Sequence, residues 1–113
     1  MAKKHPRPRS PYAVEAARLL GAQIRLARRK RRWSQAELAE RVGITARTVY
    51  KIEYGDLSVS LGAAFEAAAL LRVPLFHAER AQLSTELDRV QARSALLRRP
   101  SRAHASGEPN DAF

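Results

Sequence analysis

Several hydrogen-bonding side chains are grouped in one short stretch of this sequence. Residues 45–51 hold two Thr hydroxyls, the guanidinium of Arg47 and the ammonium group of Lys51, and the stretch contains no acidic residue. An Arg side chain can donate two parallel hydrogen bonds to the edge of a guanine base, and a Lys side chain can reach a base or a phosphate. These residue types indicate contact with a nucleic acid more than catalysis.

The sequence shows no arrangement typical of an active site or a metal centre. The chain lacks cysteine, which excludes a thiolate nucleophile, and its three His residues are scattered over 113 positions, at His5, His77 and His104. There is no nucleophile–base constellation and no Gly-rich phosphate-binding loop. The sequence therefore predicts a protein that is not an enzyme and that needs no metal or cofactor.

The charge of the chain is concentrated at its N-terminal end. The formal net charge is +10, and eleven of the 21 Lys and Arg residues lie in residues 1–33 with one acidic residue, Glu15. The rest of the chain has no net charge, so the basic surface should be the N-terminal arm and the end of the first helix. This distribution indicates a polyanionic partner. In the run Arg28–Arg32 we expect the exposed members, Arg31 among them, to contact phosphates.

The sequence also indicates the compartment in which the protein functions. Its longest apolar stretch, residues 62–71, is interrupted by Glu66 and is too short to cross a bilayer. No apolar region of a secretory signal follows the basic N-terminus. The lack of cysteine fits a reducing compartment. These observations predict a soluble, cytoplasmic protein.

The pattern of apolar and capping residues predicts an all-α fold. Residues 1–10 are basic and rich in proline, so we expect a flexible arm that follows a phosphate backbone. Ser is preferred as the N-cap of a helix and Pro as its first residue, so Ser10 and Pro11 predict the start of a helix. The buried stripe expected on this first helix consists of Ala16, Leu20, Ile24 and Ala27.

Two short helices joined by a tight turn should follow. The signals are a capping box at Ser34 and Glu37, a hydrophobic staple at Trp33 and Leu38, a left-handed Gly43 after Val42, and a helix cap at Thr45. Such a short link makes two helices cross steeply, and the small Ala39 lets them approach. The second of them, residues 45–54, should turn Val49 and Ile52 inward and project from the surface.

Two more helices are expected after the turn at Gly55 and Asp56. Ser60 caps the fourth, which carries Leu61, Ala64, Phe65, Ala68 and Leu71. The fifth runs from about Leu75 to Arg98 with a heptad-like stripe of Phe76, Leu83, Leu87, Val90 and Leu97. This stripe is either a dimer seam or a surface that packs on its own domain. The predicted organisation is an arm (1–10), a domain (11–75), a C-terminal helix for dimerisation or partner binding (76–99) and a disordered tail (100–113).

The segment from Leu19 to Leu75 resembles the Xre/Cro/phage-repressor-type helix-turn-helix family. The matching positions are Arg28, Ser34-Gln35, Glu37-Leu38-Ala39, Gly43, Thr45, Ile52-Glu53 and Gly55. The resemblance implies a five-helix repressor-like domain in which Gln35 docks on the DNA backbone. It also implies that Ala46, Arg47, Thr48 and Lys51 contact base edges in the major groove, and that Arg28 pairs with Glu53 inside the domain.

The expected function is that of a sequence-specific transcriptional regulator, most simply a repressor, that binds a double-stranded DNA operator as a homodimer. Its setting would be the bacterial cytoplasm, in association with the nucleoid. The residues expected at the DNA are Arg31, Ser34, Gln35, Thr45, Ala46, Arg47, Thr48 and Lys51. Two departures from the family pattern are Arg32 and Arg72, which stand where the family often ends a helix with Gly. Because a left-handed Arg costs about 1–2 kcal/mol, we expect these helix ends to be shaped differently.

A second resemblance leads to an alternative function. The stretch from Ser58 to Phe76, the Arg- and Leu-rich fifth helix and the acidic-aromatic end at residues 110–113 are similar to HipB-like antitoxins. That resemblance implies an interaction protein that neutralises a HipA-like toxin kinase and represses its own operon. A neighbouring kinase gene, or a kinase that co-purifies, would distinguish this alternative from a simple repressor.

Overall fold

A computed structural model describes residues 9–97, and nearly all of this segment lies in or between five helices. The helices are α1 (Pro11–Lys30), α2 (Gln35–Val42), α3 (Ala46–Glu53), α4 (Leu61–Leu71) and α5 (Arg80–Leu96). The all-α prediction is confirmed. Most of the expected basic arm and the whole of the expected tail lie outside the described residues. The chain divides into two units, of which the first ends at His77 and the second begins at Ala78.

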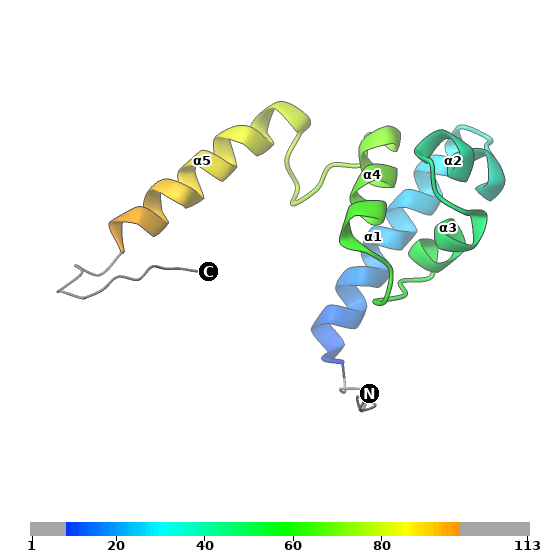
Figure 1. Ribbon diagram of the computed structural model, residues 1–113, viewed down its shortest axis with the longest axis horizontal. Helices are drawn as coiled ribbons and strands as arrows, with labels where there is room; N and C mark the ends of the chain where they lie inside the picture. The colour runs from blue at the N-terminus through cyan, green and yellow to red at the C-terminus, as the bar shows by residue number, and fades with distance from the viewer. Residues whose placement is uncertain (1–8, 98–113) are drawn as a thin grey trace. The chain divides into compact units, whose positions relative to one another are not determined.

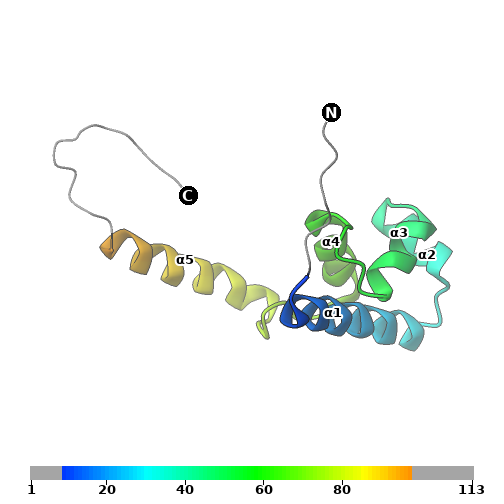
Figure 2. The ribbon, with the colours of Figure 1, turned by 90° about the horizontal axis from the view of Figure 1, so that it is seen from below.

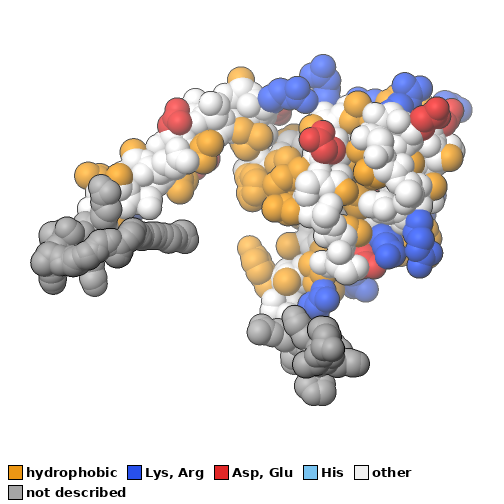
Figure 3. All heavy atoms as spheres, in the orientation of Figure 1, with side chains coloured by type: hydrophobic (Ala, Val, Ile, Leu, Met, Phe, Trp, Pro, Cys, Tyr) orange, Lys and Arg blue, Asp and Glu red, His pale blue; other side chains and the backbone are white. Residues whose placement is uncertain are grey.

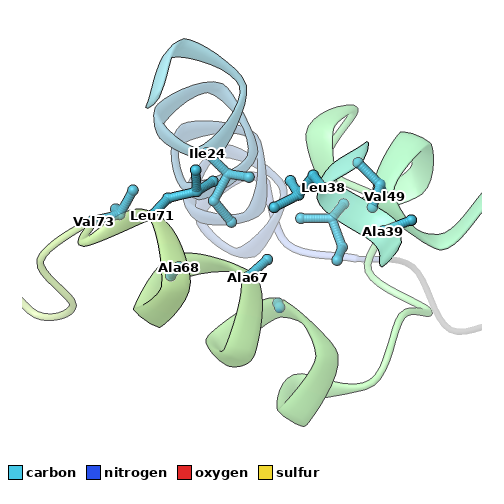
Figure 4. Packing of buried hydrophobic residues seen from close by; sticks show 10 residues of the cluster. Ile24, Leu38, Ala39, Val49, Ala67, Ala68, Leu71 and Val73 are labelled. Atoms are coloured by element: carbon cyan, nitrogen blue, oxygen red, sulfur yellow. The ribbon is translucent and has the colours of Figure 1, made fainter. Parts of the chain in front are cut away.

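The first unit is a domain built from α1 to α4 around one small core (Figures 1 and 4). Helices α2, α3 and α4 lie together on one side of the long α1 (Figure 2). The core consists of Ile24, Leu38, Ala39, Val49, Ile52, Ala64, Ala67, Ala68, Leu71 and Val73. Four of these ten residues are alanines, so the helices can approach closely but each contributes little apolar area. The core is therefore small and depends on exact spacing between helices.

The buried residues of α1 and α4 differ in part from the predicted stripes. Ile24 is fully buried and Leu20 and Ala27 pack beside it, but Ala16 is exposed. Gly21 is buried instead. On α4, Leu61 is 69% exposed because it is the first residue of the helix, before the chain reaches the core.

Gly21 sets the distance between α1 and α3. A Cβ atom at this position would overlap the carbonyl oxygen of Ile52 and would lie 2.9 Å from that of Glu53. Only glycine leaves room for the backbone of α3 to lie this close. Since α3 is held on α1 by this contact, the position of the exposed face of α3 is fixed relative to α1.

The ends of α1 and α4 contradict the expectation for Arg32 and Arg72. Both residues are left-handed, with φ of 60° and 61°, and so keep the conformation usually taken by Gly. Backbone hydrogen bonds of the Schellman type accompany each: Trp33 N–H donates to Arg28 O (3.3 Å) and Val73 N–H to Ala68 O (2.9 Å). The apolar side chains of Trp33 and Val73 pack on the core at the same points. These contacts offset the strain of the two Arg residues.

The second unit contains α5, which begins later than predicted. Phe76 and His77 both have φ of 57°, which a right-handed helix does not permit, so α5 starts only at Arg80. Gln82 Oε1 accepts a hydrogen bond from the Glu79 N–H at 3.0 Å and marks this start. Phe76 therefore does not belong to the predicted stripe. It packs edge-on against Phe65 of α4, with ring centroids 6.1 Å apart.

Candidate nucleic-acid interface

The two helices predicted to carry the DNA contacts are joined as expected. Ser34 Oγ accepts from the Glu37 N–H at 3.0 Å while Glu37 Oε1 accepts from the Ser34 N–H at 2.7 Å, which is the predicted capping box at the start of α2. Gly43 ends α2 in the left-handed conformation, with φ of 89°. Thr45 Oγ1 then accepts from the Thr48 N–H at 3.0 Å and begins α3. These local bonds fix the turn between α2 and α3.

The inner side of α3 holds it on the domain. Val49 is fully buried, and Ile52 and Glu53 are nearly so. Ala46 and Arg47 are exposed, while Thr48 and Lys51 are half-buried. The structure therefore brings these four sequence-predicted residues together on or beside the outer side of α3. Figure 3 shows Lys and Arg side chains gathered beside α3 on the right of the domain.

The hydroxyl of Thr48 already has a partner inside the domain. It lies 2.9 Å from the hydroxyl of Thr45, in addition to the backbone bond between these residues. Arg47 differs, because within residues 9–97 no hydrogen bond or ion pair engages its guanidinium. Arg47 thus keeps all its donors available.

Two aromatic residues on the same face were not predicted. Tyr50 and Tyr54 follow Arg47 by three and seven residues, both are exposed, and their ring centroids are 4.6 Å apart. The guanidinium of Arg25 on α1 lies 5.9 Å from the ring of Tyr54. The spacing of three and seven residues was a sequence signal for a shared helix face. The exposed face of α3 therefore combines a cation with two aromatic rings and continues onto α1.

A buried network connects α1, α2 and α3 behind this face. Arg28 donates from Nε to Glu53 Oε2 at 2.6 Å and from Nη2 to Glu53 Oε1 at 2.9 Å, so the predicted pair is confirmed. Its Nη1 donates to the carbonyl oxygen of Trp33 at 2.8 Å. The hydrogen bond to Glu53 raises the pKa of Arg28 above its usual value. The pair is structural, since neither charge is open to solvent.

Gln35 joins this network. Its Nε2 donates to Glu53 Oε1 at 3.0 Å, and the residue is half-buried rather than fully exposed at the surface. An amide nitrogen carries two donors, so this bond uses one and orients the other. The structure thus places Gln35 at the first turn of α2, held by the Arg28–Glu53 pair.

Arg31 and Ser34 are engaged in holding the domain together. Arg31 Nη1 donates to the carbonyl oxygen of Leu71 at 3.2 Å, and its guanidinium lies 5.4 Å from the ring of Trp33. The guanidinium of Arg41 lies closer to that ring, at 4.2 Å. Ser34 uses its side chain as the cap of α2. Arg31 is exposed and uses one of its five guanidinium donors in this bond.

The part of the chain that the structure describes contains no group of three His, Cys, Asp or Glu residues placed to hold a metal ion. Nor is any helix in residues 9–97 long and apolar enough to span a membrane.

Comparison with known families agrees with the geometry of this site. Residues 24–77 match the family described as Helix-turn-helix. This segment is a helix-turn-helix domain of the Xre/Cro/phage-repressor type. This helix-turn-helix match takes in the second half of α1 and all of α2, α3 and α4, and it ends before α5. A search of curated proteins found no match. The helix-turn-helix domain is a DNA-binding domain, and α5 is a separate addition to it.

Proposed function

We propose that the protein is a sequence-specific transcriptional regulator, acting as a repressor, which inserts α3 into the major groove of an operator. The observation that carries this proposal is the exposed face of α3, where Arg47 has no partner among residues 9–97. Arg47 would donate a bidentate pair to guanine, and Lys51 would reach a neighbouring base or phosphate. Ala46 and Tyr50 add apolar surface of the kind that packs on a thymine methyl group.

In this proposal the first turn of α2 and the turn before α3 contact phosphates. The second amide donor of Gln35 would bond to a phosphate oxygen while the first stays with Glu53. Ser34 and Thr45 contribute through the helix starts that they cap, where backbone N–H groups favour an anion. Thr48 would contact a base edge mainly through its methyl group, because its hydroxyl is bonded to Thr45. Arg31 would add a phosphate contact with the guanidinium donors that its bond to Leu71 leaves free.

We also propose that the protein binds its operator as a homodimer. One recognition helix covers only a few base pairs, whereas two on a pseudo-palindrome multiply the discrimination, with half-sites about 34–36 Å apart. Leu87 and Val90 of α5 are more than half exposed, and Leu83 lies in line with them. This stripe supports α5 as a link between two copies. The arm (residues 1–10) would add salt-dependent affinity through its four basic residues.

A second candidate function rests on the same stripe. An apolar helix face outside the DNA-binding domain suits a partner protein as well as a second copy, so an antitoxin that neutralises a HipA-like kinase and represses its operon is the alternative. Both candidates are non-enzymatic and place the protein in the bacterial cytoplasm beside the nucleoid. Affinity capture from the native host distinguishes them, since only the antitoxin would retain a kinase.

The proposal is tested by selecting binding sites from a random duplex pool with the full chain. We expect enrichment of one pseudo-palindromic site. Arg47→Ala should then lower affinity by about 1–3 kcal/mol for each half-site, and only when the guanine that Arg47 contacts is present. Arg93→Ala, which removes an exposed charge from α5, is the matched control and should not change the preferred sequence. Equal loss of operator and random DNA binding by Arg47→Ala would refute the base contact.

The direction of regulation needs a separate measurement. With the selected operator placed over a promoter, a repressor lowers reporter expression, and Arg47→Ala should restore it. An increase in expression on adding the wild-type protein would instead make it an activator.

A further inference from the structure

The outward side of α1 carries apolar residues that the domain does not use. Tyr12, Leu19 and Leu26 are 85%, 55% and 57% exposed, and they follow one another at intervals of seven residues. Figure 2 shows α2, α3 and α4 on one side of α1, which leaves the opposite side of the helix without cover from its own domain. This face is distinct from the exposed face of α3.

The spacing along this face is that of a coiled-coil seam. Steps of four and three residues connect its members, which are Tyr12, Ala16, Leu19, Gln23, Leu26 and Lys30. Such a repeat places every member on one helix stripe and is typical of a helix that packs along another helix. No helix of its own domain lies on this stripe, so the repeat indicates a partner helix from outside the domain.

Two charges beside the stripe indicate that the partner helix is α1 of a second copy. Glu15 precedes Ala16 and Arg29 precedes Lys30, so both lie on the same edge of the stripe, two heptads apart. If a second α1 packs in the opposite direction about a two-fold axis near Ala22, Glu15 of each copy faces Arg29 of the other. The same register puts Ala16 against Leu26, Leu19 against Gln23 and Tyr12 against Lys30. In a parallel register Glu15 would face the region of Glu15 itself, and the complementarity is lost.

We propose that two copies of this protein pair through the outward faces of α1, antiparallel, with Ala22 of each copy beside the two-fold axis. Ala22 is exposed and small, so the helices can approach closely there. A single helix pair buries less surface than a stable dimer needs, so this contact is weak by itself. It becomes effective when α5 or adjacent half-sites on DNA hold two copies at high local concentration.

The contact has a consequence for DNA recognition, and this step rests on the proposed function. Helix α1 is joined to α3 by the close approach at Gly21 and by the Arg28–Glu53 pair. An α1–α1 contact therefore fixes the separation of two α3 helices as part of one body. The stripe on α5 lies in the other unit of the chain, so its role would be to raise local concentration rather than to set that separation.

Site-directed cross-linking tests the contact in the absence of DNA, because the chain contains no cysteine. Ala22→Cys in the full chain should be joined to its copy by a short bis-maleimide. Ala16→Cys should not, since antiparallel helices place the two residues 16 about 15 Å apart at 1.5 Å per residue. Ala36→Cys, exposed on α2, measures random collision. Equal yields for residues 16 and 22, or a yield for residue 22 no higher than for residue 36, would overturn the proposal.

Exchange of the two charges tests the register. In the Ala22→Cys background, Glu15→Arg and Arg29→Glu should each slow cross-linking about three- to tenfold, and the double variant should restore the original rate. Glu15, Ala22 and Arg29 are all exposed, and circular dichroism verifies that the variants keep their helices. A double variant as slow as the single ones would refute the Glu15–Arg29 pairing. Because no DNA is present in this experiment, a negative result would refute only the α1–α1 contact and not the proposed role of Arg47 in DNA binding. Conversely, if cross-linking occurs but no operator is selected, only the proposed DNA-binding function is refuted.

Discussion

The domain of α1 to α4 and the helix α5 are both helical, but only the domain has an interior. Ten apolar residues and the Arg28–Glu53 pair are buried in the domain, whereas no residue of α5 is buried. The ion pair described within α5 joins Arg89 to Glu86 at 2.7 Å and is exposed. Exposed pairs of this kind contribute little to stability. The same secondary structure is thus supported by packing in one unit and by local interactions in the other.

The two units should therefore differ in the positions at which they tolerate substitution. Most of the stability of a helix in a protein comes from packing of one face, and α5 has no buried residue, so α5 is a helix that a partner would complete. The domain instead depends on close contacts between helices, because its core is rich in alanine. Substitutions should therefore be costly at buried polar and glycine positions of the domain and nearly neutral on α5.

The largest effect is expected at the buried ion pair. Glu53→Gln leaves the charge of Arg28 buried without its counter-ion and weakens the bond from Gln35, so we expect a loss of about 3–5 kcal/mol. Urea denaturation measures this loss. Glu66→Gln, which removes an exposed carboxylate from α4, is the matched control and should change stability by less than about 0.5 kcal/mol.

A double variant sharpens this prediction. Arg28→Met with Glu53→Met removes both charges and fills similar volume with apolar atoms, so it should recover most of the stability that Glu53→Gln loses. If the double variant is as unstable as Glu53→Gln, the cost lies in lost geometry, such as the bond from Arg28 to Trp33 O, and not in an unpaired charge.

The next effect is expected at Gly21. Gly21→Ala forces α1 away from the carbonyl groups of Ile52 and Glu53, and overpacking of this kind costs about 1–3 kcal/mol. Gly62→Ala on α4 is the control, since its Cβ would meet nothing within 4 Å, and it should gain about 0.5–1 kcal/mol from helix propensity. Opposite signs for the two variants are expected in thermal melts. The same sign for both would mean that α1 and α3 can separate without cost.

The domain could be predicted well because its signals are local. The caps at Ser10, Ser34, Thr45 and Ser60 depend on residues three positions apart, and each is present in the structure. The helix boundaries of the first unit follow directly from them. The Arg28–Glu53 pair spans 25 positions and came only from the family resemblance, since no local pattern indicates a contact over that distance.

The features that could not be predicted depend on long-range packing or on backbone geometry. The role of Gly21 could be predicted only if the helix that crosses α1 at this point were known, and no local sequence pattern indicates that crossing. The late start of α5 follows from two left-handed residues, Phe76 and His77, whose types do not favour that conformation. Tyr50 could have been predicted as part of the exposed face, because its spacing from Arg47 places it on the same helix face.

A smaller gain is expected at the end of α4. Arg72 is left-handed, with φ of 61°, and Gly adopts this conformation without strain. After the larger entropy loss of Gly on folding is subtracted, Arg72→Gly should stabilise the domain by about 0.5–1 kcal/mol. Arg47→Gly in the right-handed first turn of α3 should destabilise it by up to about 1 kcal/mol. Calorimetry of both variants checks the signs, and a destabilising Arg72→Gly would show that the Arg side chain contributes contacts of its own.

The smallest effect on folding is expected on α5, where the change should appear in assembly instead. Leu87→Glu with Val90→Glu places like charges along the exposed stripe. Because neither side chain is buried, the unfolding free energy of the α1–α4 domain should change by less than about 0.5 kcal/mol. Light scattering should show a loss of dimer, and operator affinity should fall because each half-site is then bound alone. Thr85→Glu and Ala92→Glu add the same two charges on the side of α5 opposite the stripe and should leave the dimer intact. If the Leu87 and Val90 variant unfolds the domain, the stripe packs on the domain; if it remains a folded dimer, α5 is not the link between two copies.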